Sequence, residues 1–434
     1  MGKIYYERGK RMEQKKSFIC IDLKSFYASV ECVERGLDPF KTNLVVADPS
    51  RSKSTICLAI TPAMKSQGVK NRCRIHEIPK GLEYITAMPR MQLYIDYSAR
   101  IYSIYLRYVS KEDIHVYSID ECFMDVTNYL SLYHMTEKEM AVELMRAVME
   151  ETGITATAGI GTNLYLAKIA MDIVAKHVDD HIGILDEISF RKKLWTHKPL
   201  SDFWRIGSRT EKKLAGYGIH TMGDIARTSI TSEDWLYKMF GIDAELLIDH
   251  AWGLESCRMS DIKSYHTEER SLSNGQVLMR NYSYEEAVVV VREMTDVLVL
   301  DLVDKGLVTD SVTLWVAYDH KLERPSSHGT VKFDYLTNSS RSIMDGVENL
   351  YRKIVDRYTG IRRIEICANR VKVESYLQYN LFMDMEAVEK EKNLQKAVLS
   401  VQKRYGKNAI MRGANLLDCS TYRERNGQIG GHRA

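Results

Sequence analysis

The sequence predicts an α+β protein built from several domains. Residues 17–177 alternate short apolar strands with amphipathic helices, while residues 189–250 read almost entirely as helix. Residues 265–373 then give strand, helix, two strands, helix and strand, which is the order of a ferredoxin-like unit. A chain of 434 residues is long enough for several domains of roughly 100–200 residues each, so the three patterns predict separate domains.

The first pattern indicates a mostly antiparallel sheet that is covered by helices on one face. Strands are expected at residues 17–22, 43–47, 55–60, 115–120, 121–126 and 154–160. Helices are expected directly after Asp22 and at residues 62–68, 94–109, 136–152 and 162–176. Gly68 ends the first of these numbered helices, and Thr162 or Asn163 caps the last.

The βαββαβ pattern follows a linker. Residues 251–266 have weak periodicity and mixed polarity, which is typical of a linker. Strands are expected at 276–278, 311–318, 330–335 and 362–371, and helices at 283–305 and 342–358. Beyond Glu374, a charged helix at 386–404 precedes a basic, Gly-rich end, for which DNA contact and partner binding are both open.

The composition is that of an ordinary globular protein, with 45% hydrophobic and 27% charged residues. The formal net charge of +3 does not by itself indicate a nucleic-acid partner. No run approaches the roughly 20 apolar residues of a membrane span, and the polar start M-G-K-I-Y-Y-E-R-G-K-R is not a secretory signal. The eight cysteines form no C-x-x-C pair, so we expect free thiols in a cytoplasmic protein and no zinc site.

Three acidic residues lie where two apolar strands end. Asp22 closes the run S-F-I-C-I-D, and Asp120 and Glu121 lie within H-V-Y-S-I-D-E-C-F-M-D. A charge inside an apolar strand is costly unless it is neutralised, and carboxylate oxygens are the ligands that Mg²⁺ prefers. These residues are therefore candidate ligands of a two-metal phosphoryl-transfer site. The alternative is that they are acids of a surface turn.

Four motifs together resemble the Y-family translesion DNA polymerases, near the bacterial UmuC-like branch. They are C-I-D-L-K-S-F-Y-A-S-V-E at 20–31, S-I-D-E at 118–121, G-I-G-T-N-L-Y-L-A-K-I-A at 159–170 and P-L-S-D-F-W-R-I-G-S-R-T-E-K-K-L at 199–214. The resemblance extends from about residue 17 to about residue 374. The C-terminal run Y-R-E-R-N-G-Q-I-G-G-H-R-A is also similar to the tails of bacterial UmuC-like proteins. One such motif has limited specificity, but four in this order are highly specific.

The resemblance implies a right-hand polymerase with a ferredoxin-like palm, small fingers, a helical thumb with a helix-hairpin-helix, and a βαββαβ little finger. The implied boundaries are an N-terminal extension at 1–16, palm at 17–27 and 88–177, fingers at 28–87, thumb at 178–250, linker at 251–264, little finger at 265–374 and a tail at 375–434. The implied function is template-directed, error-prone translesion synthesis without proofreading, as a part of DNA repair in the SOS response.

In the palm, the resemblance implies that Asp22, Asp120 and Glu121 are catalytic. They would bind two Mg²⁺ ions, with the carbonyl group of Leu23 completing one coordination shell. The backbone N–H groups of Ser25, Phe26 and Tyr27 stand at the start of a helix, where they could bind the phosphates of the nucleotide.

Two further side chains correspond to nucleotide-binding residues of the family. Tyr27 corresponds to the steric gate, the aromatic ring that clashes with a 2′-hydroxyl group; the alternative is a core aromatic. Lys168 corresponds to a lysine that approaches the β- and γ-phosphates as a point charge. The alternative for Lys168 is a solvated helix face.

The fingers depart from the family pattern. Where many relatives have a Tyr and an Arg that clamp the triphosphate, the run T-P-A-M-K-S-Q-G-V has Thr61 and Met64. Lys65, Arg72 and Arg74 are candidate replacements, and ordinary surface roles are the alternative for each. Small residues nearby predict a loose pocket for the nascent base pair, which is compatible with damaged templates; they are Ser54, Thr55, Ala59 and Thr61.

The run at 204–214 resembles a helix-hairpin-helix, whose backbone N–H groups hold DNA phosphates. Gly207 is retained, but Arg205 stands where the first glycine of the motif is usual. Arg209 and Lys212 add positive charge for duplex binding that does not depend on sequence.

The little finger is not basic as a whole, but its last strand carries Arg362, Arg363 and Arg370. Two helices would cover one face of its sheet and leave the other face for the DNA backbone. The alternative is a plain solvated sheet face.

The run Q-Y-N-L-F at 378–382 resembles the peptide that binds the bacterial sliding clamp. Leu381 and Phe382 would fill an apolar pocket while Gln378 forms a hydrogen bond at its edge. The alternative is a docked terminal segment.

The implied partners are primed template DNA, dNTPs, the sliding clamp and, as for some relatives, an accessory SOS protein or a recombinase filament. No membrane partner is expected. Two other classes remain open. The same carboxylates could serve a two-metal nuclease or nucleotidyl cyclase, and the chain could be a non-catalytic repair scaffold that binds DNA and the clamp.

Overall fold

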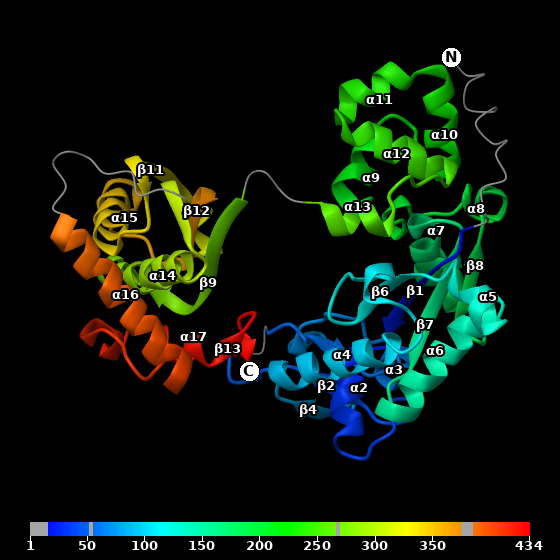
Figure 1. Cartoon of the computed structure of the whole chain (residues 1–434), viewed down its shortest axis with the longest axis horizontal. Helices are drawn as coiled ribbons and strands as arrows, with labels where there is room; N and C mark the ends of the chain where they lie inside the picture. The colour runs from blue at the N-terminus through cyan, green and yellow to red at the C-terminus, as the bar shows by residue number, and fades with distance from the viewer. Residues whose placement is uncertain (1–15, 52–54, 266–269, 375–384) are drawn as a thin grey trace. The chain divides into compact units, whose positions relative to one another are not determined.

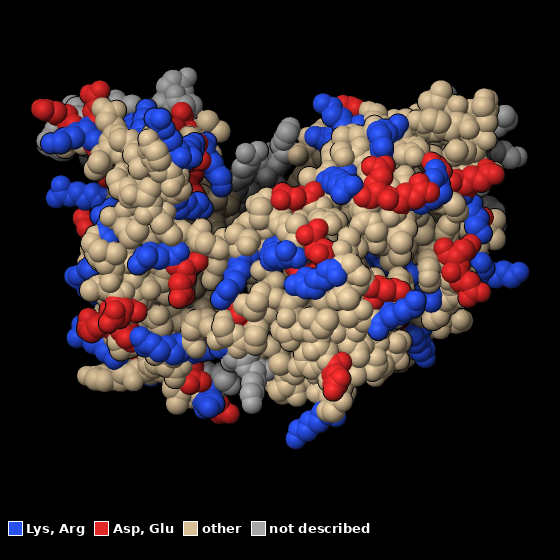
Figure 2. Space-filling model, turned by 90° about the horizontal axis from the view of Figure 1, so that it is seen from below, with Lys and Arg blue, Asp and Glu red and all other residues tan. Residues whose placement is uncertain are grey.

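The structure is a computed structural model, and it describes residues 16–51, 55–265, 270–374 and 385–434. The chain divides into two compact units, Met1–Tyr265 and His266–Ala434 (Figure 1). On the face seen in Figure 2, Lys and Arg side chains are interspersed with Asp and Glu, in agreement with the small net charge. In the described part of the chain, no helix is long and apolar enough to cross a membrane.

A five-stranded sheet lies at the centre of the first unit, in the order β5-β6-β1-β7-β8. The middle strand β1 (Phe18–Leu23) pairs antiparallel with β6 (Glu121–Asp125) and with β7 (Ala156–Gly161). β5 (Ile114–Val116) pairs with β6, and β8 (Ile182–Leu185) runs parallel to β7. The predicted, mostly antiparallel sheet is confirmed, and β8 is a strand that the sequence patterns did not predict.

The sheet is covered on both faces, so the expectation of a single covered face is wrong. Residues 18–21 of β1 are all buried, although successive side chains of a strand point to opposite faces. On one face, Phe18 and Cys20 pack against α7 (Leu164–Ile169). The other helices of this region are α2 (Phe26–Val33), α4 (Met91–Tyr105), α5 (Tyr129–Tyr133) and α6 (Glu137–Thr152). The helix predicted at 162–176 therefore covers one of the two faces.

That helix changes its winding twice. It begins with α7, which is capped by Asn163; the side chain of Asn163 accepts a hydrogen bond of 2.8 Å from the Leu166 N–H. A π-helical turn at Ala170–Val174 and a 3₁₀ turn at Ala175–His177 follow. Because π turns are rare and often occur at functional sites, the side chains of this helix are considered with the site below.

A small three-stranded sheet in the order β3-β2-β4 forms the region predicted as fingers. It comprises β2 (Leu44–Val46), β3 (Ala59–Ile60) and β4 (Ile85–Ala87), with α3 (Pro62–Ser66) after β3. Only the last two residues of the strand predicted at 55–60 pair as β3. β4 was not predicted, because three residues are too few to show a period.

The region after β8 is helical, as predicted. It contains α8 (Glu187–Leu194), α9 (Ser208–Ala215), α10 (Met222–Thr231), α11 (Glu233–Phe240) and α12 (Asp243–Trp252). The predicted linker holds a further helix, α13 (Met259–Ser264), whose buried Met259 packs against the sheet residues Phe18 and Cys20. The stretch predicted as a linker therefore contains a helix that packs against the sheet.

The second unit contains the predicted βαββαβ order. Its four-stranded antiparallel sheet has the order β11-β10-β12-β9, formed by β9 (Arg270–Tyr282), β10 (Leu307–Tyr318), β11 (Ser327–Thr337) and β12 (Ile361–Val373). The helices α14 (Tyr284–Asp304) and α15 (Ser340–Ile354) pack on one face of the sheet. Buried and partly exposed residues alternate along β10 and β12, so one face is covered and the other is open, as predicted.

The basic C-terminal end is a folded part of the second unit. It contains α16 (Met385–Tyr405), α17 (Tyr422–Asn426) and a small hairpin of β13 (Gln428–Ile429) and β14 (His432–Arg433). Glu293 of α14 is 2% exposed and accepts hydrogen bonds from Asn415 Nδ2 at 3.3 Å and from the Thr421 N–H at 3.1 Å. The end of the chain therefore supplies the donors that a buried carboxylate of the βαββαβ unit requires.

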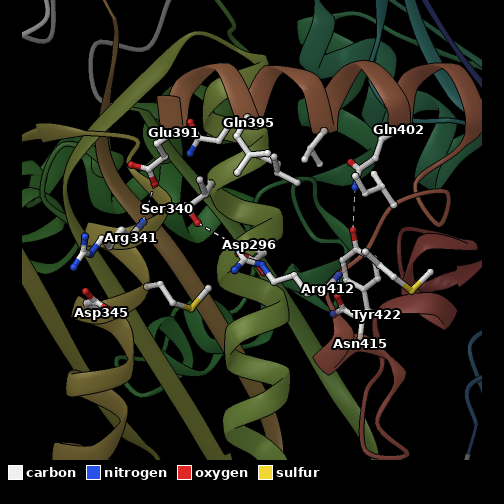
Figure 3. A pocket seen from close by; sticks show the side chains of 17 residues that line it. Asp296, Ser340, Arg341, Asp345, Glu391, Gln395, Gln402, Arg412, Asn415 and Tyr422 are labelled. Atoms are coloured by element: carbon white, nitrogen blue, oxygen red, sulfur yellow. Dashed lines mark hydrogen bonds and ion pairs between the residues drawn. The ribbon is translucent and has the colours of Figure 1, made fainter. Parts of the chain in front are cut away.

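A cavity of about 620 Å³ lies between α14, α15, α16 and this C-terminal end. Figure 3 shows Arg412 directed at Asp296 of α14, with Arg412 Nε 2.5 Å from Asp296 Oδ2. In the same view, Gln402 of α16 reaches Tyr422 of α17, with a hydrogen bond of 3.1 Å. The first contact joins the C-terminal end to α14, and the second joins α16 to α17 within that end.

Candidate active site

The strand register brings the three predicted carboxylates to one end of the five-stranded sheet. Asp22 of β1 stands directly opposite Glu121 of β6. The Leu23 N–H donates a hydrogen bond of 2.9 Å to the backbone carbonyl of Asp120, so Asp120 lies beside the end of β1. Three acidic residues from two separate parts of the sequence thus lie side by side, at the end of β1 and at the start of β6.

The electrostatics of the site favour a cation. Burial, together with the carboxylates of Asp120 and Glu121, raises the pKa of Asp22 to about 7. Burial also raises the pKa of Glu121, although Lys168 opposes that shift. Like charges that are held together out of water disfavour one another, and a divalent cation would relieve this repulsion. The donor set is all carboxylate and carbonyl oxygen, which suits Mg²⁺.

Two of the three carboxylates, those of Asp120 and Glu121, are at the same time engaged with a nearby donor. Asp120 Oδ1 accepts a hydrogen bond of 2.6 Å from Ser118 Oγ, and Glu121 Oε2 lies 2.8 Å from Lys168 Nζ. Among the described residues, no group of three His, Cys, Asp or Glu side chains is drawn together closely enough to hold a metal ion. The backbone therefore brings the carboxylates side by side, and their side chains would have to turn toward a shared ion.

Lys168 is held at the carboxylates by an unusually close contact between helix and sheet. A Cβ atom built on Gly159 of β7 would lie 2.1 Å from the Ala167 carbonyl oxygen, and one on Gly161 would lie 2.2 Å from the Ala167 nitrogen. Only glycine permits this approach of two backbones. The approach directs Lys168 of α7 at Glu121, and Asp172 of the π turn is 3.0 Å from the same Nζ atom.

The lysine is charged as well as buried. Burial alone would lower the pKa of Lys168, but the carboxylates of Asp172 and Glu121 together raise it above its ordinary value. The predicted alternative, a solvated helix face, does not fit a side chain that is 9% exposed. The Lys168 ammonium group is therefore a fixed positive charge beside the acidic cluster.

The start of α2 has the properties of an anion site. Ser25 precedes the helix in the left-handed conformation, with φ of 49°, which is rare for a residue other than glycine. The Ser25 Oγ atom is buried and has no hydrogen-bond partner in the described part of the chain. The first N–H groups of a helix also lack partners within the helix. The backbone at Ser25–Tyr27 therefore presents unpaired donors a few residues from Asp22.

Tyr27 lies beside the carboxylates and is half-buried. Burial and the carboxylate of Asp120 raise the pKa of Tyr27, whereas Arg72 lowers it. Its ring stacks on the ring of Tyr94, with centroids 4.4 Å apart and planes at 15°. The ring therefore stands between the acidic cluster and a second aromatic side chain.

Thr61 and Met64, which replace the family's triphosphate clamp, are structural residues here. Thr61 Oγ1 accepts a hydrogen bond of 3.1 Å from the Leu44 N–H, and Met64 is fully buried in the core of the small sheet. Lys65 faces Asp22 instead: burial lowers the pKa of Lys65 and Asp22 raises it. Arg72 is close enough to Tyr27 to affect its pKa. These two residues are the cations that the fingers offer to the site.

The sequence patterns did not single out Lys24. Burial lowers the pKa of Lys24, Asp22 raises it, and Lys65 lowers it further, so Lys24 and Lys65 are both close to Asp22. A signal for this was present in the sequence, because Lys24 follows Asp22 by only two residues, in the turn directly after β1.

The thumb residues are exposed, as DNA contact requires. Gly207 is the residue before α9, and Gly207, Arg209 and Lys212 are all exposed. Arg205 adopts the left-handed conformation, with φ of 69°. Arg205 therefore adopts a backbone conformation that a glycine at this position would adopt without strain.

On the open face of the second unit, two of the predicted arginines have acidic partners. Arg363 Nη2 lies 3.0 Å from Glu365 Oε2, and Arg370 Nη2 lies 2.8 Å from Asp310 Oδ1. Arg362 is half-buried. The predicted clamp-binding residues Gln378, Leu381 and Phe382 lie outside the described residues.

Known proteins match the chain in both units. Residues 21–172 match the impB/mucB/samB family, and residues 269–381 match the C-terminal domain of that family. DNA polymerase IV 2 of Bacillus subtilis (strain 168) is 30% identical over 425 residues, which cover 97% of this chain and 100% of the relative. DNA polymerase IV 2 of Halalkalibacterium halodurans is 27% identical over 420 residues, which cover 96% of this chain and 99% of the relative.

Among solved structures, the Y-family DNA polymerase chimera Dbh-Dpo4(243-245)-Dbh is similar to this chain, with a TM-score of 0.64 and 21% sequence identity. The similarity covers 82% of this chain and 99% of the chimera. The first family match includes the strands that carry Asp22, Asp120 and Glu121, and the second includes the βαββαβ sheet. The chain therefore belongs to the impB/mucB/samB family and has the fold of the Y-family DNA polymerases.

Proposed function

We propose that this protein, a DNA-directed DNA polymerase of the translesion class, adds nucleotides to a primer at Asp22, Asp120 and Glu121 by two-metal nucleotidyl transfer. The observation that carries this proposal is the strand register, which sets Asp22 opposite Glu121 and next to Asp120. The raised pKa of Asp22, to about 7, adds support, because it reflects burial and two neighbouring carboxylates that a cation would offset.

Two Mg²⁺ ions, bound by these carboxylates and the Leu23 carbonyl, would lower the pKa of the primer 3′-hydroxyl and neutralise charge on the triphosphate. The protein side chains bind and orient the nucleotide. Lys168 offers its ammonium group to the β- and γ-phosphates, and Lys65 and Lys24 add positive charge close to Asp22. Fixed charges that already face the leaving group need no reorganisation during the reaction.

The start of α2 holds the triphosphate in the same proposal. The N–H groups of Ser25, Phe26 and Tyr27 and the unpaired Ser25 hydroxyl group are donors of the kind that bind phosphate oxygens. Tyr27 is the steric gate: a 2′-hydroxyl group on the incoming sugar would clash with its ring. A Tyr27→Ala variant should therefore incorporate ribonucleotides, and unchanged sugar discrimination in that variant would argue against the assignment.

The DNA would be held outside the palm. The start of α9, with Gly207, Arg209 and Lys212, is the proposed contact to duplex phosphates in the thumb. The open face of the second unit, including Arg362, Arg363 and Arg370, is the proposed contact in the little finger. Because two of these arginines already have acidic partners, this contact should depend on salt less than the number of cations suggests.

The remaining assignments follow the family pattern. We keep palm at 17–27 and 88–177, fingers at 28–87, thumb at 178–250 and little finger at 265–374. Gln378, Leu381 and Phe382 are proposed to bind the sliding clamp. An accessory SOS protein or a recombinase filament is a further proposed partner.

Primer extension separates the possible activities. The wild type and the double variant Asp120→Asn/Glu121→Gln are incubated with primed template, dNTPs and Mg²⁺, and DNA binding is measured in parallel. We expect the wild type to lengthen the primer and the variant to bind DNA but extend at least about a thousandfold more slowly, since the site supplies several kcal/mol. Shortening of the primer by the wild type would indicate a nuclease, and binding alone would indicate a scaffold.

A further inference from the structure

Glu31 of α2 is a buried carboxylate with an unusually complete set of donors. Its side chain is fully buried. Arg90 binds both carboxylate oxygens, with Nε 3.0 Å from Oε1 and Nη2 2.8 Å from Oε2, and Arg35 also reaches Oε2. The hydroxyl group of Tyr94 donates a hydrogen bond of 2.7 Å to Oε1. Both oxygens are thus satisfied by groups from the turn after α2, from α4 and from the residue that precedes α4.

Tyr94 connects this network to Tyr27. Its ring is fully buried and stacks on the Tyr27 ring, at 4.4 Å between centroids and 15° between planes. Tyr27 and Glu31 are four residues apart on α2, so they share one face of the helix. The same tyrosine therefore touches Tyr27 with its ring and Glu31 with its hydroxyl group.

The network fixes Tyr94 in one orientation. Burial raises the pKa of Glu31, but hydrogen bonds from Arg90, Tyr94 and Arg35 lower it further than burial raises it, so the carboxylate is ionised. A charge-assisted hydrogen bond to a carboxylate held by two arginines is stronger than one between neutral groups. Fully satisfied buried networks of this kind are rigid. The Tyr94 ring is therefore held both by packing and through its hydroxyl group.

A steric gate excludes a 2′-hydroxyl group only if its ring cannot move aside. The Tyr27 ring is half-buried, and it packs on Tyr94 in the stacked geometry described above. Movement of Tyr27 toward Tyr94 would require Tyr94 to leave its place against Glu31. The ring that is proposed to meet the sugar is therefore packed against a buried ring that is itself held by Glu31.

We propose that Tyr94, oriented by Glu31, is a positioning residue for sugar discrimination, which supports the Tyr27 ring against displacement by a ribonucleotide. The inference rests on the proposed role of Tyr27 as the steric gate. It assigns a specificity function to two residues that touch neither the nucleotide nor the metal ligands.

Single-nucleotide incorporation with dNTP and with the matching rNTP tests this proposal. The measured quantity is the ratio of the two kcat/KM values, because a loss of general fold quality lowers both values and leaves the ratio unchanged. Tyr94→Leu, which removes the stacked ring, should lower the discrimination ratio roughly two- to tenfold, the worth of one aromatic pair. Tyr94→Phe keeps the ring and loses only the bond to Glu31, so its ratio should fall by less.

Tyr97 provides a matched control. Its hydroxyl group donates a hydrogen bond of 2.7 Å from α4 to Glu34 Oε1, directly after α2 and at an exposed position. Tyr97→Phe therefore removes the same kind of bond without touching the support of Tyr27, and its ratio should equal that of the wild type. Thermal unfolding of each variant identifies any that is too unstable to compare, and Tyr94→Phe then stands in for Tyr94→Leu.

Tyr27→Ala serves as the reference variant. If Tyr27→Ala loses discrimination but Tyr94→Leu and Tyr94→Phe keep it, the inference is overturned while the gate assignment stands. If the Tyr94 variants lower both kcat/KM values equally, Tyr94 is merely structural and the inference is again overturned. Unchanged discrimination in Tyr27→Ala itself would overturn the gate assignment and this inference together.

Discussion

The variant Lys168→Met removes the cation that two buried or partly buried carboxylates share. Lys168 Nζ lies 2.8 Å from Glu121 and 3.0 Å from Asp172, and the side chains of Lys168 and Glu121 are each 9% exposed. Removing one partner of a buried ion pair costs about 3–5 kcal/mol, because the remaining charge stays buried and unpaired. We take about 3 kcal/mol, which corresponds to a fall in Tm of about 6–12 °C for a unit of this size.

Thermal unfolding in the presence of EDTA measures this loss without a cation that could replace the lysine. Lys138→Met is the matched control, because Lys138 Nζ lies 2.6 Å from Asp180 Oδ2 at an exposed position of the same unit. Exposed ion pairs contribute about 0–1 kcal/mol, so the control should lose little stability. Equal losses in the two variants would refute the account of Lys168 as the buried counter-charge of the site.

The stability of Lys168→Met should also depend on pH with a definite sign. Burial raises the pKa of Glu121 and Lys168 is the main group that lowers it, so the pKa should rise further when the lysine is removed. A carboxyl group whose pKa is raised in the folded state binds its proton more readily there than in the unfolded chain. The difference in Tm from the wild type should therefore shrink as the pH falls from 8 to 6. A difference that stays constant would contradict this reasoning.

Three other variants probe the fold around the site. Gly159→Ala should cost more than about 2 kcal/mol, because its Cβ would overlap a backbone carbonyl group of α7, whereas Gly207→Ala meets nothing within 4 Å and should be neutral in thermal unfolding. Met64→Arg restores the arginine of the family pattern but places a charge in a closed core, so Tm should fall and KM for dNTP should not improve. Glu293→Ala should speed limited proteolysis between residues 405 and 421, whereas Glu285→Ala, in the exposed first turn of α14, should not. Unchanged cleavage would mean that Glu293 does not hold the C-terminal end.

Much of the fold could be predicted from local patterns. The βαββαβ unit was predicted because its helices are long and its strands alternate, and both signals are local in the sequence. Asp22, Asp120 and Glu121 could be singled out because charged residues interrupt apolar strands. Their adjacency, however, depends on the pairing of β1 with β6, which joins residues about a hundred positions apart.

The features that were missed depend on contacts between distant segments. β8 is four residues long and becomes a strand by pairing with β7, and the second covered face of the sheet requires the glycines of β7. From the sequence alone, Glu31 is an ordinary acidic residue of a helix. Its contacts with Arg90 and Tyr94, which come from another part of the chain, are visible only in the structure. A sequence motif identifies such residues as members of a pattern but does not give their partners.

The departures from the family pattern also needed the structure. The sequence alone showed that Met64 stands where many relatives have an arginine. Only the structure shows that Met64 is buried, which explains why this position cannot clamp the triphosphate. The left-handed conformations of Ser25 and Arg205 had no local signal, since neither residue favours positive φ. Both occur where the surrounding fold determines the backbone, beside the proposed phosphate sites.

The most direct test of the central claim is primer extension by the wild type beside Asp22→Asn, in Mg²⁺, with matched DNA binding and thermal unfolding. Asp22 is chosen because its carboxylate is flanked by those of Asp120 and Glu121 and, among the described residues, has no direct ion pair to lose. The account predicts that the wild type extends the primer and that Asp22→Asn folds and binds DNA but extends it about a hundredfold more slowly or worse. Extension by Asp22→Asn at the rate of the wild type would contradict the assignment of the catalytic site to this end of the sheet.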